Sequence, residues 1–254
     1  MDKVKRAIPL IVSLMVFLTL YQMALKPRLF YKLTPTVIVG IVAAVTAFVL
    51  SKPREKRFFN YYIPPLLYLF GVLSFLLFIE INIIKIAFAF IFSFLIWIFL
   101  ENLYLSFNQP QKYQLYGFQN FSNYFNLITV FLIYSSFYGY IVFLRVPLWP
   151  LLIAVAVVTF LVLEELMWAS EINLKRSWLY NLVTVIIIAE GFWTVAFLPS
   201  SMYVDGLILT VIYYLLSGVF LNKLLGILDN SVIRRYVIIS VIILAVVLMS
   251  AKWI

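Results

Sequence analysis

Nine apolar runs, most of them about 20 residues long, fill almost the whole of this 254-residue chain. A helix needs about 20 apolar residues to cross the ~30 Å hydrocarbon core of a bilayer. Hydrophobic residues make up 65% of the chain and charged residues 11%, whereas soluble domains average roughly 45–50% and about 25%. The pattern predicts an all-α, polytopic transmembrane helical bundle with about nine spanning helices, forming one integral membrane domain over residues 1–254.

Short loops separate the predicted spans, and several span ends carry helix-starting or helix-ending residues. Thr34 and Pro35 are expected to be the N-cap and first turn of the second span, and Pro199 is expected to follow the seventh. A cleaved first span would leave eight, but Tyr21–Ala24 is a poor signal-peptide cleavage site, so we expect that span to be retained. The predicted spans are 7–25, 34–50, 62–79, 83–105, 121–144, 148–168, 178–198, 204–222 and 232–252.

The distribution of Lys and Arg between loops predicts the orientation of the chain. With the N-terminus inside, 13 basic residues fall in inner segments and 5 in outer segments. Inner loops of membrane proteins carry the excess of basic residues, so we expect the N-terminus in and the C-terminus out, in a prokaryotic cytoplasmic membrane. The inner set is Lys3, Lys5, Arg6, Lys52, Arg54, Lys56, Arg57, Lys112, Lys175, Arg176, Lys223, Arg234 and Arg235, and the outer set is Lys26, Arg28, Lys32, Arg145 and Lys252.

Missing residue types exclude several chemistries. The chain has no cysteine and no histidine, so it contains no disulfide, no thiolate or histidine metal site and no serine–histidine pair. We expect no cofactor, no metal and no catalytic motif. The net charge of +9 is attributed to anionic lipid headgroups rather than to nucleic acid. The expected lipid contact is the loop containing Lys52, Arg54, Lys56 and Arg57.

Four carboxyl side chains lie within apolar runs: Glu101, Glu164, Glu165 and Glu190. An ionised carboxylate at the bilayer centre costs roughly 2.5–3.5 kcal/mol on insertion scales, so such residues are functional candidates. Glu101 and Glu165 are close to the predicted inner ends of their spans. We expect both to reach interfacial water or to pair with a nearby basic residue.

Glu190 is placed near the middle of the seventh span, nine positions after Asn181. At about 100° per residue the two lie on opposite faces of the helix. A helix with polar groups on both faces is typical of a position enclosed by other helices. We therefore expect this span at the bundle centre, with the Glu190 carboxyl buried, uncharged and hydrogen-bonded, in either a structural or a functional role.

The fifth span combines tyrosines with small residues. Tyr134 and Tyr138 are neighbours at i,i+4, and Ser135 and Gly139 form a small-xxx-small pair. Small pairs let helices approach closely in lipid, as we also expect for Gly40 and Ala44 in the second span. The fifth span is therefore interpreted as a tight packing element, with a tyrosine-lined polar passage as the alternative. Aromatic residues at predicted span ends are expected to form interfacial belts.

Three function classes fit these observations. The favoured one is a non-catalytic, multi-pass membrane scaffold or subunit, with lipids and other membrane subunits as partners. The first alternative is a transporter or channel for a small solute or lipid that uses Glu190 and Glu165. The second is an intramembrane enzyme acting on a lipid-linked substrate, with Glu164 or Glu165 as general base. A candidate polar site comprises Glu190, Glu165, Glu164, Glu101, Asn181, Tyr134 and Tyr138.

Overall fold

The computed structural model describes residues 2–26, 30–49, 58–108 and 117–251. Within these ranges the chain forms nine α-helices and one short 3-10 helix, η2, and contains no strand. The predicted all-α bundle is confirmed. The α-helices are α1 (Asp2–Leu25), α2 (Phe30–Val49), α3 (Ile63–Leu76), α4 (Asn82–Asn108), α5 (Gly117–Leu144), α6 (Leu148–Ala169), α7 (Leu174–Val195), α8 (Met202–Leu224) and α9 (Asn230–Ser250), and η2 covers Phe58–Tyr61.

Seven helices in the described part of the chain, α1 and α4 to α9, are long and apolar enough to cross a membrane. The other two apolar stretches, 32–47 and 63–76, are shorter. At 1.5 Å per residue, the 14 residues of α3 extend about 21 Å, less than the hydrocarbon core. The expectation that 62–79 forms a full span is therefore wrong, because α3 by itself is too short to cross the hydrocarbon core. Two prolines, Pro64 and Pro65, lie in its first turn, and most of its residues are buried.

The second and seventh helices have boundaries that differ from those of the predicted spans. The second helix starts at Phe30, so Thr34 is not its cap and Pro35 lies inside it. The seventh helix starts earlier than expected because the Asn173 side chain caps it, accepting a hydrogen bond from the Lys175 N–H at 3.0 Å. It also ends earlier, at Val195, which confirms that Pro199 lies beyond the helix.

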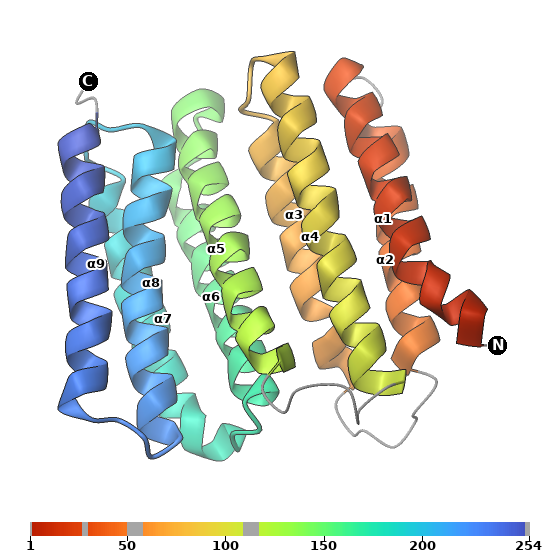
Figure 1. Ribbon diagram of the computed structural model, residues 1–254. Coiled ribbons are helices and arrows are strands. Elements are labelled where there is room, and N and C mark those ends of the chain that lie inside the picture. The colour runs from red at the N-terminus through yellow and green to blue at the C-terminus, as the bar shows by residue number, and fades with distance from the viewer. Residues whose placement is uncertain (1, 27–29, 50–57, 109–116, 252–254) are drawn as a thin grey trace. The chain divides into compact units, whose positions relative to one another are not determined.

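The chain divides into two compact units, Met1–Phe125 and Asn126–Ile254, and the boundary falls inside α5. In the first unit, α1 packs against α2 and α4, and α3 lies beside α4 (Figure 1). Its core is aromatic: the Phe125 ring lies 4.5 Å from Tyr68 and 4.8 Å from Phe99. The predicted small-residue contact of α2 is confirmed, because Ala44 is buried and a Cβ on Gly40 would lie 3.7 Å from the Met15 methyl carbon of α1.

The second unit contains the rest of α5 and the hairpin-connected helices α6 to α9. Neighbouring pairs along the chain, α6–α7, α7–α8 and α8–α9, pack against each other, and α9 lies beside α8 in Figure 1. In the most apolar part of each helix, 56% of residues are buried for α8, 28% for α7 and 11% for α9. The expectation that α7 lies at the bundle centre is therefore wrong, because one of its faces forms the surface.

Candidate functional site

A fully buried carboxyl group lies between α5 and α6 in the second unit. The Glu165 side chain is 0% exposed, and the Asn126 amide donates a hydrogen bond to its Oε2. Glu165 is four residues from the end of α6, but its side chain points inward, whereas Lys175 and Arg176 are exposed. The expectation that Glu165 reaches interfacial water is therefore wrong. The face of α6 on which Glu165 lies determines its burial, whereas its position along the helix does not.

A second layer of polar contacts follows farther along α5. The Tyr134 and Thr159 hydroxyls lie 2.8 Å apart, and Thr159 also donates to the Val155 carbonyl at 2.7 Å. Since a hydroxyl has one proton, Tyr134 is the donor in their contact. Tyr138 donates to the Phe192 carbonyl at 3.2 Å, and the two rings lie 4.6 Å apart. Both predicted tyrosines are buried within packed contacts, as expected for the packing interpretation of this helix.

Four buried polar side chains in this unit make no hydrogen bond of normal geometry among the described residues: Ser135, Asn181, Tyr213 and Ser240. Asn181, on α7, is 0% exposed, and neither its amide nitrogen nor its oxygen makes a hydrogen bond. The buried Tyr213 hydroxyl on α8 also makes none of normal geometry, although Ser217, Glu165 and Tyr134 lie within interaction range. Buried polar groups are nearly always paired with protein, water or a ligand, and among these four residues Asn181 is the one with two unpaired atoms.

Asp205 is a buried carboxylate that the sequence reasoning missed. It lies in the first turn of α8, is 4% exposed, and accepts a hydrogen bond from the Ser200 hydroxyl. It is also within electrostatic range of Tyr138. An acidic residue in the first turn is typical of helix starts, because it interacts favourably with the helix dipole, and this signal could have identified Asp205. Glu165 and Asp205 thus occupy opposite ends of the second unit, with the buried tyrosines between them.

Helices α5 and α8 approach each other very closely at Ser135 and Gly206. A Cβ built on Gly206 would lie 2.1 Å from Ser135 Oγ and 2.7 Å from the Ser135 Cα and N atoms. No side chain fits at such distances, so only glycine is compatible with this contact. The predicted small-residue packing of the fifth span is therefore found at Ser135, with Gly206 as a partner that the sequence did not identify.

Glu190 does not belong to this interior. Ser177, Asn181 and Thr184 share the buried face of α7, as predicted, but Glu190 and Thr194 lie on its exposed face. The expectation that the Glu190 carboxyl is buried inside the bundle is wrong. Asn181 and Glu190 do lie on opposite faces of α7, as predicted. The assumption that other helices cover both faces was wrong.

The remaining candidate carboxylates are half-buried. Glu164 precedes Glu165 on α6 and points to a different side of that helix, while Glu101 lies on α4 in the first unit. The structure does not place Glu101 and Glu165 in one unit. Among the described residues there is no group of three or more acidic, cysteine or histidine side chains that could hold a metal ion.

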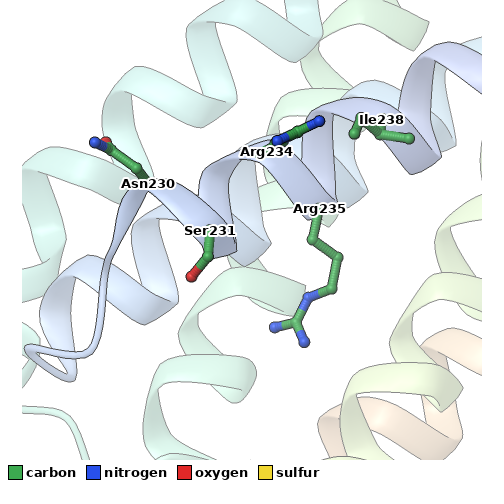
Figure 2. A pocket seen from close by; sticks show the side chains of 5 residues that line it. All are labelled: Asn230, Ser231, Arg234, Arg235 and Ile238. Atoms are coloured by element: carbon green, nitrogen blue, oxygen red, sulfur yellow. The ribbon is translucent and has the colours of Figure 1, made fainter.

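Basic side chains lie at the helix ends. The predicted lipid-contact residues Lys52, Arg54, Lys56 and Arg57 fall outside the described residues. At the start of α9, Asn230, Ser231, Arg234, Arg235 and Ile238 line a shallow, open pocket of about 480 Å³ (Figure 2). Figure 2 shows the Arg235 side chain extending from the helix. Exposed arginines of this kind are suited to lipid headgroups at an interface.

The first unit carries an apolar groove between α1 and α4. It has a volume of about 270 Å³ and is lined by Leu10, Ser13, Leu14, Phe17, Phe90, Ser93, Phe94 and Trp97. Its lining carries no charged residue, and the two serines donate to carbonyls of their own helices. The groove is therefore a packing or lipid-contact surface rather than a site of acid–base chemistry.

Comparisons of the chain with known protein families, curated proteins and solved structures find no match. Its assignment rests on the helices themselves. Seven described helices are long and apolar enough to cross a bilayer, and large apolar side chains are exposed along them, including Ile153, Ile187 and Val241. Such surfaces are stable in lipid rather than in water. The protein is a multi-pass integral membrane protein.

Proposed function

We propose that the protein is a non-catalytic subunit of a membrane assembly and that the outer face of α7 binds a partner membrane helix. The observation that carries this proposal is the position of Glu190. Its exposed carboxyl lies five residues before the end of α7, about 8 Å inside the helix, among the exposed side chains of Ile186, Ile187 and Trp193.

A carboxyl on a lipid-facing apolar surface is unfavourable, and a glutamate is too short to reach water easily from that depth. A partner helix with a basic, amide or hydroxyl side chain would satisfy it. Hydrogen bonds between helices in lipid contribute roughly 0.6–2 kcal/mol each, enough to select one partner surface over another. The apolar neighbours of Glu190 supply the packing area around that contact.

The second unit also supports an orientation. The α6–α7 and α8–α9 connections lie at the same end of the antiparallel bundle (Figure 1). That end carries Lys175, Arg176, Lys223, Arg234 and Arg235, whereas Arg145 lies at the other end. We assign the basic end of this unit to the cytoplasm and, with it, the C-terminus to the outside, while the N-terminus inside is proposed from the distribution of basic residues along the sequence.

Transport of a small solute is the second candidate, favoured by the buried Glu165 and its polar surroundings. Its route does not include Glu190, because that residue faces away from the interior. An enzymatic role for Glu165 is not proposed, since a general base must reach the proton that it abstracts and this carboxyl is 0% exposed.

The test is photocrosslinking in native membranes, with benzoylphenylalanine in place of Ile187 and, as the control, in place of Val157. Both side chains are exposed on apolar helix faces, on α7 and α6 respectively. A discrete protein adduct is expected from position 187 and not from position 157, and its yield should fall in the Glu190→Leu background. An adduct of twice the chain's mass identifies a second copy as the partner.

Purified protein in nanodiscs provides the complementary measurement. Because Glu190 faces out, Glu190→Leu should leave the thermal stability of the isolated chain unchanged or raised. The proposal is overturned if position 187 yields only lipid adducts, or if Glu190→Leu unfolds the isolated chain while Glu190→Gln does not.

A further inference from the structure

We propose that the groove between α1 and α4 binds one acyl chain of a membrane phospholipid, with the lipid phosphate held by Arg6 beyond the end of the groove. The proposal goes beyond the subunit role, because the groove belongs to the first unit and Glu190 belongs to the second. Such a lipid is a bound ligand of the protein rather than part of the surrounding bilayer.

The groove offers exposed hydrocarbon on both of its walls. Leu10 of α1 is 52% exposed and Phe90 of α4 is 62% exposed. The groove volume of about 270 Å³ lies below the roughly 300–1,000 Å³ of sites for drug-sized ligands. A helix with its side chains is about 10–12 Å across. One extended chain, rather than a partner helix, is therefore the occupant that fits the groove.

The polar side chains of the groove are already paired. The Ser13 hydroxyl donates to the Leu10 carbonyl at 3.0 Å. The Ser93 hydroxyl donates to the Ala89 carbonyl at 2.7 Å. A polar ligand would therefore find no unpaired donor in the groove, whereas a hydrocarbon chain needs none. In lipid, binding of this kind rests on van der Waals contact, and a chain that lies between two helices contacts both at once.

Arg6 is aligned with the groove on α1. At about 100° per residue, it lies within the arc of the helix surface between Ser13 and Leu14, which both line the groove. Leu10 follows it by one turn on the same side. Pro9 lies within α1 but does not end it, so the helical spacing continues across it. Arg6 is exposed and makes no ion pair among the described residues. Its guanidinium is therefore available to bind a phosphate through two parallel hydrogen bonds.

The depth of the groove matches one leaflet of a bilayer. Its α1 wall runs from Leu10 to Phe17, which at 1.5 Å per residue lies about 6 to 16 Å beyond Arg6 along the helix. Half of the hydrocarbon core is about 15 Å thick. The Phe17 and Phe90 rings, with centroids 6.1 Å apart, lie at the far end of the groove. A phospholipid with its phosphate at Arg6 therefore has its acyl chain at the level of the groove.

An acidic residue of α4 lies toward the same end of the groove. Helix α4 runs antiparallel to α1 (Figure 1), and Glu101 follows the groove residue Trp97 by one turn on the same face. Glu101 is half-buried and makes no ion pair with Arg6 in the described part of the chain. A headgroup with a phosphate and an ammonium group complements both charges, so phosphatidylethanolamine is the probe for the test.

The experiment is photocrosslinking of the full chain in phosphatidylcholine nanodiscs that contain phosphatidylethanolamine with a diazirine in one acyl chain. Mass spectrometry of peptides locates the labelled residues. Labelling of the groove residues should saturate as the fraction of the probe is raised. Val241 and Val246, on the exposed apolar surface of α9, report on nonspecific lipid contact. Their labelling should rise in proportion to the probe.

Two pairs of variants make the test specific. Leu14→Trp fills the groove and should abolish the saturable labelling. Leu18→Trp is its matched control and should keep that labelling, because Leu18 is 55% exposed on the same helix but lies outside the groove, whereas Leu14 is 51% exposed. Arg6→Gln should weaken binding of the probe about fivefold, equivalent to about 1 kcal/mol. Arg176→Gln, at an exposed arginine of the second unit, should leave it unchanged.

Three results would overturn the proposal. The first is labelling of the groove that rises in proportion to the probe, as on α9. The second is saturable labelling that persists in Leu14→Trp. The third is an affinity for the probe that is the same in Arg6→Gln as in the wild-type chain.

Discussion

Single residues in the second unit acquire their roles from the helix face they occupy rather than from their depth. Glu165 and Glu190 are both glutamates within apolar helices, yet the first is 0% exposed beside Asn126 and the second is exposed among apolar side chains. The sequence identified both as candidates because of their charge. It could not assign their surroundings, because that depends on which helices pack against each face.

The Tyr134 hydroxyl gives a prediction at this scale. Since Thr159 keeps its bond to the Val155 carbonyl when the tyrosine is shortened, Tyr134→Phe removes one buried hydrogen bond without leaving a donor unpaired. We expect a loss of about 0.5–1.5 kcal/mol in the free energy of unfolding, measured by thermal unfolding in detergent. Tyr124→Phe, at an exposed position of the same helix, is the control and should be silent. A Tyr134→Phe variant as stable as the wild type would show that the hydroxyl contact is not formed.

At the scale of helices, hydropathy predicted well where the helices occur, but it predicted less well which of their faces are covered by other helices. All nine apolar runs correspond to helices in the described ranges, and the opposite faces of α7 were correctly separated. The short length of α3 and the surface position of α7 were not predicted. In a bilayer, lipid-facing and helix-facing side chains are equally apolar, so hydrophobicity does not distinguish the two environments.

The close contact between Gly206 of α8 and Ser135 of α5 predicts how a substitution at Gly206 changes the stability of the protein. Gly206→Ala places a methyl group within 2.7 Å of Ser135 backbone atoms, so the two helices must separate. We expect a loss of about 1–3 kcal/mol in stability, as for overpacked cores, with faster backbone amide exchange in α8. Gly40→Ala is the matched control, because its new Cβ would lie 3.7 Å from the Met15 methyl carbon, an ordinary contact. That change should be neutral, and equal effects of the two substitutions would contradict the close approach.

At the scale of the whole molecule, the protein is a membrane-embedded chain whose second unit has a polar interior and an outer face on α7 that carries Glu190. In the interior of the second unit, the buried Asn181 and Tyr213 side chains make no hydrogen bond of normal geometry among the described residues, and the outer face of α7 presents a carboxyl among apolar side chains. Composition and the lack of cysteine and histidine predicted the membrane class and excluded whole groups of chemistry. They did not predict which polar side chains are buried in the second unit, since Asn126, Glu165, Asn181 and Tyr213 come from four helices that are far apart in the sequence.

The crossing of the membrane by α7 is the claim on which the proposed function depends, because it fixes the depth of Glu190. Single cysteines at Glu171 and Phe197, exposed positions in the turns before and after α7, report on it directly, since the chain has no native cysteine. With a membrane-impermeant maleimide on intact cells, Phe197→Cys should react at once and Glu171→Cys only after permeabilisation. Reaction of both cysteines from the same side would show that α7 does not span the membrane and would contradict the account.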